Sequence, residues 1–430
     1  MARVEFISHS GAGQAGANAF ELRLGERRLL LDCGATSRAR PKWIDAIDGV
    51  DAIWLSHVHW DHVGSLSHAV AGYPRVPLLA GTETADLLPF ALKAAWGNDP
   101  QGEKRGAAIA GRVQKIAELK FTPILDSAAG SKVPGINIMR FPAGHTLGAS
   151  MLLVEWERET QRPFRVLYTG DFCTHDQVLV KGALIPRVGP DFEIDVLMSE
   201  GILGTDLEAD GLEYTDEAHR LAADMGANQG PRLLAVSPLG EAFEALAILI
   251  AAGHKPFVHD WLQPLFEIWR ERFPDELSLL ENRFVDAAQA RQLLQGGQIV
   301  AAAGEQLQTS STAGRLALEI AHLDDAFIAV FNRVSPNTPA GLALAAPRGQ
   351  QLDWKGRPII VRAQFAHYRL LNHAPRWQIL ATIKALAPRQ VIFVHGKKGA
   401  LHALSRALIS GGFDGDVHIP QNREIISLLR

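Results

Sequence analysis

The chain has 430 residues, of which 47% are hydrophobic and 21% charged, and a formal net charge of −4. This length suits two or three packed units, and the composition is that of a globular protein with a large buried core. The sequence has no long uncharged apolar run, which argues against a membrane span. It also has no excess of basic residues, so its charge gives no indication of a polyanion-binding protein.

The N-terminal residues alternate between apolar and polar types and lack the apolar centre of a signal peptide, so we expect a cytoplasmic protein. The chain has two cysteines, Cys33 and Cys173, and no Cys-x-x-Cys pair, which excludes a disulfide framework. We expect both to be small buried residues near the functional aspartates described below.

Residues 1 to about 205 are predicted to form strands separated by short helices. Alternation with a period of two residues predicts strands at 4–7, 19–24, 28–32, 136–141, 151–156 and 165–168. Residues 82–95 are predicted to form a helix that packs outside the strands. So many strands predict stacked antiparallel sheets with helices on the outside.

From about residue 206 strands and helices alternate. Strands are predicted at 233–237, 299–303 and 327–331, with helices at 241–252 and 313–322, which indicates a parallel α/β unit. Further strands are predicted at 358–363 and 391–394. A helix is predicted between them at 375–386, with Pro375 suited to its first turn.

The segment from Ile53 to Gly64 reads Ile-Trp-Leu-Ser-His-Val-His-Trp-Asp-His-Val-Gly. An apolar strand ends here, and three imidazoles and a carboxylate follow within six residues: His57, His59, Asp61 and His62. Imidazole nitrogen and carboxylate oxygen are ligand types that catalytic zinc sites use. Chance placement of this pattern in one chain is improbable, so the segment predicts a metal site.

This segment resembles the signature of the metallo-β-lactamase superfamily. Three further segments resemble other motifs of the superfamily, in order and spacing: Leu30-Leu-Asp32-Cys-Gly34, Ala143-Gly-His145-Thr-Leu-Gly148 and Tyr168-Thr-Gly-Asp171-Phe172. The resemblance implies an αββα sandwich of the α/β class. It also implies that Asp32 braces the metal loop without touching metal, although Asp-x-Gly after a strand is also an ordinary turn.

By the same resemblance one zinc ion takes His57, His59 and His145, while a second takes Asp61 and His62, with Asp171 bridging the two. Two divalent ions so placed hold a hydroxide between them and stabilise the attacking and leaving oxygens. The mixed nitrogen and oxygen ligands also suit manganese.

The end of the chain resembles the β-CASP branch of the superfamily, nucleases that include RNase J and the cleavage and polyadenylation endonuclease. The matching segments are Asp195-Val-Leu-Met-Ser-Glu200, His373-Ala-Pro-Arg376 and Val391-Ile-Phe-Val-His395-Gly396. They imply that His395 completes the second zinc site and that His373, oriented by Glu200, is the general acid or a phosphate ligand. Asp61, His373 and Glu200 are thereby assigned to the catalytic step.

Other histidines are weaker candidates. His367 competes with His373 for the role of the acid, whereas His175 and His68 are predicted to be bystanders. The domain organisation implied is a core over 1–205, an inserted β-CASP-like cap over 206–365 and a returning part of the core over 366–430. Histidine at position 395 resembles the RNA enzymes of the branch rather than the DNA enzymes, which carry valine there.

The inserted segment departs from the family pattern. Its acidic motif continues Gly201-Ile-Leu-Gly204, the loop 304–314 carries Glu305 where a phosphate-cradling turn is usual, and Lys397 follows Gly396. Residues 205–365 hold 13 Lys and Arg against 21 Asp and Glu, a net charge of −8. Such a cap repels a phosphodiester strand unless its charges face outward, the substrate is short or a protein partner supplies a basic surface.

Three functions remain open from the sequence. The first is a two-zinc phosphodiesterase that cleaves RNA or another single-stranded nucleic acid, as an endonuclease or a 5′-exonuclease, by attack of a metal-bridging hydroxide with His373 as general acid. The second is a hydrolase of small esters, thioesters or lactones on the same metal core. The third is a non-catalytic subunit of a nucleic-acid-processing complex, although such subunits usually lose metal ligands that this chain keeps.

Overall fold

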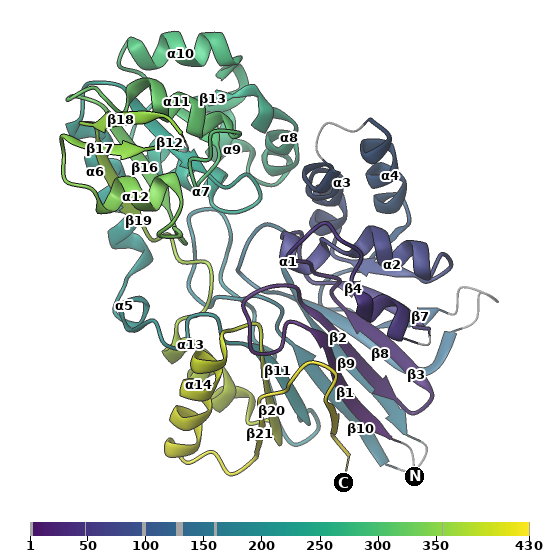
Figure 1. The fold of residues 1–430 in the computed structure, drawn as a ribbon. Coiled ribbons are helices and arrows are strands. Elements are labelled where there is room, and N and C mark those ends of the chain that lie inside the picture. The colour runs from purple at the N-terminus through teal and green to yellow at the C-terminus, as the bar shows by residue number, and fades with distance from the viewer. Residues whose placement is uncertain are drawn as a thin grey trace. The chain divides into compact units, whose positions relative to one another are not determined.

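The computed structural model describes residues 3–47, 49–96, 100–125, 132–158, 161–354 and 356–429. The chain forms two compact units (Figure 1). The core unit comprises Met1–His175, Gly182–Gly211 and Asn372–Arg430, and the inserted unit comprises Asp176–Lys181 and Leu212–Leu371. None of the helices in the described ranges combines the length and the apolar character that crossing a bilayer requires.

The first sheet of the core unit has seven strands in the order β22-β1-β2-β3-β4-β5-β6. Their bounds are β1 Val4–Ser10, β2 Ala19–Leu24, β3 Arg27–Leu31, β4 Ala52–Leu55, β5 Leu78–Ala80, β6 Val113–Lys115 and β22 Ile425–Ser427. The pairs among β22, β1, β2 and β3 are antiparallel, whereas those from β3 to β6 are parallel.

The second sheet has the order β21-β20-β11-β10-β9-β8-β7. Its strands are β7 Thr122–Leu125, β8 Lys132–Pro142, β9 Ser150–Arg158, β10 Gln161–Tyr168, β11 Val196–Glu200, β20 Gln390–Val394 and β21 Asp416–His418. Strands β7 to β10 pair antiparallel, and β10, β11, β20 and β21 pair in parallel. The sequence-based expectation of antiparallel sheets was therefore wrong for half of each sheet, because long connections carry the chain back before the next strand begins.

The two sheets stack face to face, since side chains of both share one apolar cluster. Phe6 and Leu22 from the first sheet pack with Val154 and Val166 from the second, and all four are at most 1% exposed. Alternate residues of each strand face this layer, as a two-sheet sandwich requires.

Helices cover the outside of the sandwich (Figure 1). The helices of the core unit are α1 Trp60–Val63, α2 Leu66–Gly72, α3 Thr82–Trp96, α4 Pro100–Ala110, α5 Leu207–Asp210, α13 Arg376–Leu386 and α14 Lys398–Ser410. Ile379 of α13 and Leu401 of α14 pack with Phe393 on the outer face of the second sheet. The predicted α/β sandwich is confirmed.

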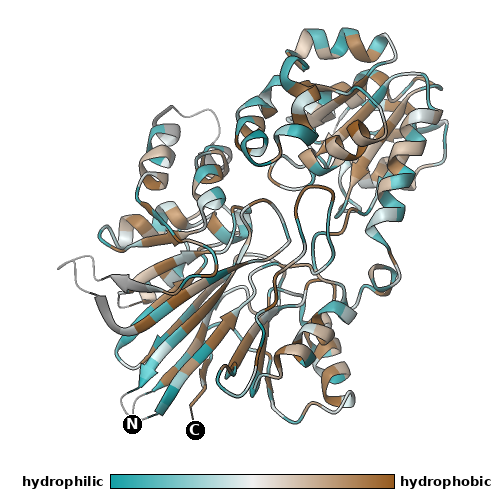
Figure 2. Ribbon diagram, turned by 180° about the vertical axis from the view of Figure 1, so that it is seen from behind, coloured by the Kyte–Doolittle hydropathy of each residue, from teal (hydrophilic) through white to brown (hydrophobic). Residues whose placement is uncertain are grey.

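The inserted unit is built on a parallel sheet in the order β14-β13-β15-β12-β16-β19. Its strands are β12 Arg232–Val236, β13 Phe257–His259, β14 Phe284–Val285, β15 Ile299–Ala303, β16 Phe327–Phe331 and β19 Gln364–Tyr368, and β17 Gln350–Asp353 pairs with β18 Pro358–Val361 in a separate hairpin. The helices are α6 Tyr214–Ala227, α7 Ala242–Ala251, α8 Gln263–Arg272, α9 Pro274–Leu277, α10 Ala287–Gln295, α11 Thr312–Ile320 and α12 Pro339–Ala345. In Figure 2 the strands of this sheet are mostly brown, as expected for a parallel sheet buried on both faces.

The start of α13 and strand β19 are among the details that differ from the sequence-based expectations. Pro375 caps α13 in an extended conformation with φ −57° and ψ 161°, so the helix begins one residue later, at Arg376. Strand β19 had no prediction of its own, because its mixed sequence Gln-Phe-Ala-His-Tyr has neither a clear alternation nor a continuous apolar run.

Candidate metal centre

The predicted metal-binding side chains follow the ends of strands in both sheets of the core unit. His57 and His59 come directly after β4, Asp171 follows β10, and His395 follows β20. Strands β3 and β4 are parallel neighbours, as are β10, β11 and β20. Because the carboxyl ends of parallel strands lie at one edge, the loops that follow them meet there.

The backbone at this edge is held in unusual conformations. Asp32 and His395 have φ of +62° and +45°, in the left-handed region that non-glycine residues seldom adopt. Such conformations persist where the surrounding structure imposes them, often at functional sites. Gly34 makes close packing possible, since a Cβ there would lie 1.7 Å from the carbonyl oxygen of Asp61.

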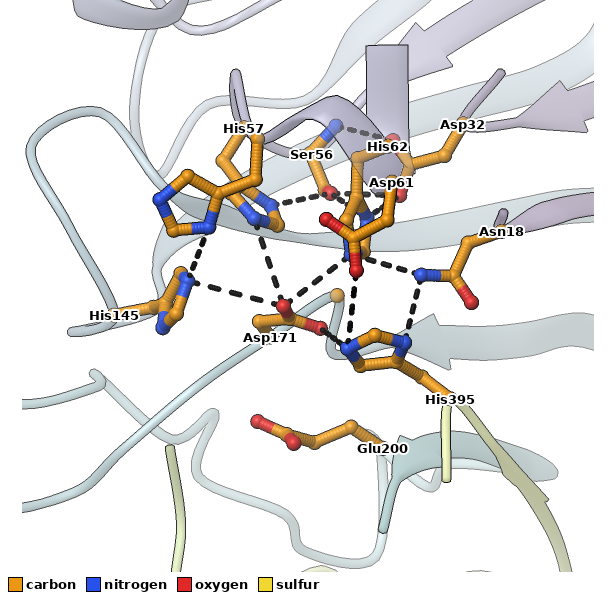
Figure 3. Close-up of polar contacts among 12 residues, drawn as sticks. Asn18, Asp32, Ser56, His57, Asp61, His62, His145, Asp171, Glu200 and His395 are labelled. Carbon is orange, nitrogen blue, oxygen red and sulfur yellow. Dashed lines mark hydrogen bonds and ion pairs between the residues drawn. The ribbon is translucent and has the colours of Figure 1, made fainter. Parts of the chain in front are cut away.

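One group of ligand atoms comprises His57, His59, His145 and Asp171, all within 4.8 Å of one another (Figure 3). Nε2 of His145 lies 3.0 Å from Nδ1 of His59 and 3.8 Å from Oδ2 of Asp171. Nε2 of His57 lies 3.6 Å from the same carboxylate oxygen. His57 and His145 therefore converge on one oxygen of Asp171, and His59 contacts His145 beside them.

A second group comprises Asp61, His62 and His395. Nε2 of His395 lies 3.8 Å from Oδ2 of Asp61 and 3.3 Å from Oδ1 of Asp171. Nε2 of His62 lies 3.2 Å from Oδ2 of Asp171. Asp171 therefore stands between the two groups, with one carboxylate oxygen toward His395 and the other toward the remaining histidines.

Asp32 is fully buried behind the second group. Its Oδ2 lies 2.7 Å from Nδ1 of His62 and accepts hydrogen bonds of 2.7 Å from the hydroxyls of Ser56 and Tyr168. The backbone N–H of Ser56 donates to Oδ1 at 2.7 Å. A carboxylate that accepts from Nδ1 of a histidine fixes the ring and leaves Nε2 to face a metal ion.

The electrostatics of the cluster follow from burial and from its two carboxylates. Burial lowers the pKa of His57, His59 and His145, which favours the neutral form that binds metals. For His62, burial lowers the pKa, but the charges of Asp171 and Asp32 outweigh it and hold the pKa well above its usual range.

The pKa of Asp171 moves in the opposite direction. Burial raises it, yet the positive charges of His395, His62 and His373 outweigh burial and hold it well below its usual range.

The arrangement fits a bound cation. Among the residues that the structure describes, Nε2 of His57 is buried in the cluster without a hydrogen-bond partner, 3.6 Å from Oδ2 of Asp171. An unpaired buried polar atom costs about 1–3 kcal/mol, so an unpaired imidazole nitrogen that faces a buried carboxylate fits a site for a cation. The nitrogen and oxygen donors are of the type that zinc binds.

His373 lies at the open side of the cluster, with its side chain 22% exposed where that of Asp171 is 2% exposed. Its Nδ1 lies 3.0 Å and 3.1 Å from the two carboxylate oxygens of Glu200. Burial lowers the pKa of His373, but Glu200 and Asp171 outweigh it and raise the pKa to about 9. Glu200 also accepts the N–H of Phe172 at 2.8 Å, so it holds the chain directly after Asp171.

The other predicted histidines lie apart from this cluster. His367 belongs to the inserted unit, where its Nε2 lies 2.5 Å from the carbonyl oxygen of Asn332. His175 pairs with Gln378, and His68 lies on α2. Cys33 and Cys173 are both buried beside the site aspartates, with the thiol of Cys173 directed to the carbonyl oxygen of Gly144 at 3.0 Å.

Sequence reasoning missed two contacts of the cluster. Nδ2 of Asn18, a fully buried residue, lies 2.9 Å from Nε2 of His62 and 2.8 Å from Nδ1 of His395 (Figure 3). The carbonyl oxygen of Asn372 lies 2.8 Å from Nδ1 of His145. Asn18 follows a glycine-rich segment that is typical of a turn, and a backbone carbonyl leaves no mark in the sequence.

Residues 12–180 match the family model of the metallo-beta-lactamase superfamily. This match makes the first part of the core unit similar to that superfamily. Residues 358–420 match a second family model, the Zn-dependent metallo-hydrolase RNA specificity domain. The first match contains six of the clustered residues and the second contains His373 and His395, so the resemblance to the superfamily and its β-CASP branch is confirmed.

Proteins of similar sequence align over about half of this chain. A Synechocystis protein described as uncharacterized is 30% identical over 251 residues, which are 58% of this chain and 41% of that protein. Cleavage and polyadenylation specificity factor 73 of Drosophila melanogaster is 27% identical over 263 residues, 56% of this chain and 35% of that protein. A probable RNase of Methanocaldococcus jannaschii is 26% identical over 211 residues, 48% of this chain and 47% of that protein.

The chain thus spans less than half the length of each of these three relatives. A solved structure, a protein of unknown function from Enterococcus faecalis V583, superposes with a TM-score of 0.62 and covers 99% of this chain and 100% of that one. Its sequence is 14% identical, so this likeness concerns the fold alone.

Proposed function

We propose that this protein is a metal-dependent ribonuclease with two zinc ions. The observation that carries the proposal is the pair of ligand groups on either side of Asp171, with His373 and Glu200 at the open side. The names of the relatives support the substrate, since one is a cleavage and polyadenylation factor and another a probable RNase. We further propose that the inserted unit is the cap predicted over 206–365.

One ion would be held by His57, His59 and His145, the other by Asp61, His62 and His395, with Asp171 shared between them. Divalent ions there supply Lewis-acid stabilisation of charge on a phosphoryl oxygen and make a water molecule acidic enough to attack near neutral pH. Manganese remains an alternative to zinc, because both accept nitrogen and oxygen donors.

His373 is proposed as the general acid. A third group of ligand atoms contains His373 with Asp171 and His395, but Nδ1 of His373 is hydrogen-bonded to Glu200. That contact holds the proton on Nδ1 and directs the other ring nitrogen away from Glu200. A protonated His373 can then transfer the proton on Nε2 to the leaving oxygen as the phosphorus–oxygen bond breaks. Glu200 stabilises the charged ring and positions it.

The proposal is tested with end-labelled RNA and DNA strands, single and double, incubated with the purified protein loaded with zinc or manganese. A phosphodiester model compound and a thioester are assayed beside them. We expect cleavage of single-stranded RNA that EDTA abolishes and added metal restores, and the product lengths give the mode and polarity of cleavage. Hydrolysis of the thioester without any phosphodiester cleavage would overturn the proposal in favour of a small-ester hydrolase.

A further inference from the structure

The core unit contains an open cavity of about 700 Å³ that Trp60 and Gly64 of the metal loop help to line. Its walls come from the loop after β3, from α1, from α2 and from the end of α4. Trp60, which forms part of the wall, stands in the chain between His59 and Asp61. The occupant of this cavity would therefore lie against the segment that carries four of the clustered residues.

The walls of the cavity are basic. Arg38, Arg105 and Arg112 line it together with His68, and the described lining residues include no aspartate or glutamate. An NH2 group of Arg112 donates to the carbonyl oxygen of Pro74 at 2.8 Å, which fixes this guanidinium in the wall. The cavity thus concentrates positive charge in a chain whose net charge is −4.

Trp60 adds a flat aromatic surface to this charge. A Cβ at Gly64 would lie 2.7 Å and 2.8 Å from two atoms of the indole ring. Only glycine at position 64 therefore leaves space for the ring in its observed position. Indole and guanidinium groups together suit a nucleotide, because bases stack on aromatic rings and phosphates pair with arginine. A cavity of this volume is in the ordinary range for a ligand site.

We propose that this cavity binds a nucleotide of the single-stranded RNA substrate, with its base against Trp60 and its phosphates at Arg38, Arg105 and Arg112. This inference rests on the proposed ribonuclease function. It also accounts for how a chain with an acidic inserted unit retains a polyanion. The whole chain has a net charge of −4 and residues 205–365 have −8, so the rest of the chain has +4. Three arginines of that remaining part line the cavity.

The test is fluorescence anisotropy with a labelled, cleavage-resistant phosphorothioate RNA strand and the zinc-loaded full chain. The double variant R38Q/R105Q removes two exposed charges from the cavity, and K120Q/R187Q removes two exposed charges from loops of the core unit outside the cavity as a matched control. Two lost phosphate contacts should weaken binding by more than about tenfold at 0.1 M salt and lower the salt slope by about 1.4. The control should change affinity by less than about twofold.

The outcomes separate the two proposals. Equal affinity of both double variants overturns the cavity site and leaves the ribonuclease proposal standing. A wild-type chain that binds no RNA overturns both. Photocrosslinking with 5-iodouridine RNA provides an independent readout, since the expected adduct lies on the peptide that contains Trp60, and adducts confined to the inserted unit would place the strand elsewhere. Free AMP at millimolar concentration should compete weakly, whereas strong competition would identify a free nucleotide as the occupant.

Discussion

The core unit and the inserted unit both bury a carboxylate near the end of a parallel strand, but the pKa of that carboxylate shifts in opposite directions in the two units. Asp171 follows β10 and is 2% exposed, and Glu241 follows β12 and is 5% exposed. Imidazole nitrogens of five histidines lie within 4 Å of the Asp171 carboxylate, and its pKa is held low despite burial. Glu241 accepts hydrogen bonds from the N–H of Ser237 and from Nδ2 of Asn332, and burial raises its pKa to about 7.

The difference shows that burial alone does not make a metal site. A buried carboxylate surrounded by neutral amides takes up a proton. One surrounded by imidazoles stays ionised, which is the form that binds a metal ion. The described part of the inserted unit contributes no group of ligand atoms to the clusters, all of which lie in the core. The predictions below test this contrast, beginning with the largest expected effect.

Replacing a group at the centre of the cluster should eliminate hydrolysis. Asp171→Ala and His59→Ala each remove a ligand from the proposed ions, so we expect RNA cleavage to fall to background while the circular dichroism spectrum is retained. Asp191→Ala, at an exposed position before β11, is the matched control and should cleave like the wild type. Substantial activity in both cluster variants would contradict the two-metal mechanism.

Replacing the proposed acid should have a large but incomplete effect. His373→Ala should lower the rate of phosphodiester cleavage by roughly 10²–10⁴-fold, the usual contribution of a general acid. Metal content should stay the same, because His373 is placed outside the ligand set. His402→Ala on α14 controls for loss of an exposed histidine. An unchanged rate in His373→Ala, with a reduced rate in His367→Ala, would move the role to the inserted unit.

Asn18 should act on metal affinity more than on the fold. If His395 binds metal through Nε2, its Nδ1 carries the proton. Asn18 must then turn its side-chain amide so that Oδ1, rather than Nδ2, faces Nδ1 of His395. This turn also gives the buried Oδ1 a hydrogen-bond partner. Asn18→Leu should then lower zinc affinity by about 10–100-fold in chelator competition.

Asn18→Asp offers an oxygen in the same place and should retain most of the affinity, and Asn337→Leu at an exposed site is the control. Equal losses in the leucine and aspartate variants would assign Asn18 to packing alone.

The smallest predicted effect concerns the inserted unit. Because the pKa of Glu241 is raised from 4.5 to about 7, the folded state binds a proton that the unfolded state releases, so stability falls as the pH rises from about 4.5 to 7. Glu241→Gln removes this penalty and can donate to the buried Oδ1 of Asn332. It should raise the melting temperature by about 2–4 °C at pH 8 and by less at pH 5. A loss at both pH values would show that the carboxylate stabilises the unit.

The sequence predicted which side chains of the core gather better than it predicted the contacts around them. The candidate ligands of the first 200 residues stand in short motifs after strands, and parallel strands bring such loops together whatever the details of the fold. Neither the glycine-rich approach to Asn18 nor the contact of Asn372 with His145 was predictable, because each depends on loops that are distant in the chain. Strand β19 was missed because its residues are only partly buried, and the parallel halves of the sheets were missed because alternation does not reveal strand direction.

The central claim is that the buried histidines and aspartates of the core hold metal ions. Equilibrium dialysis of the purified chain against zinc, followed by elemental analysis, tests it directly. We predict about two zinc ions per chain for the wild type and for Asp191→Ala, and a loss of bound zinc in Asp171→Ala. A wild-type chain that retains no transition metal after dialysis, and whose melting temperature zinc leaves unchanged, would contradict the account.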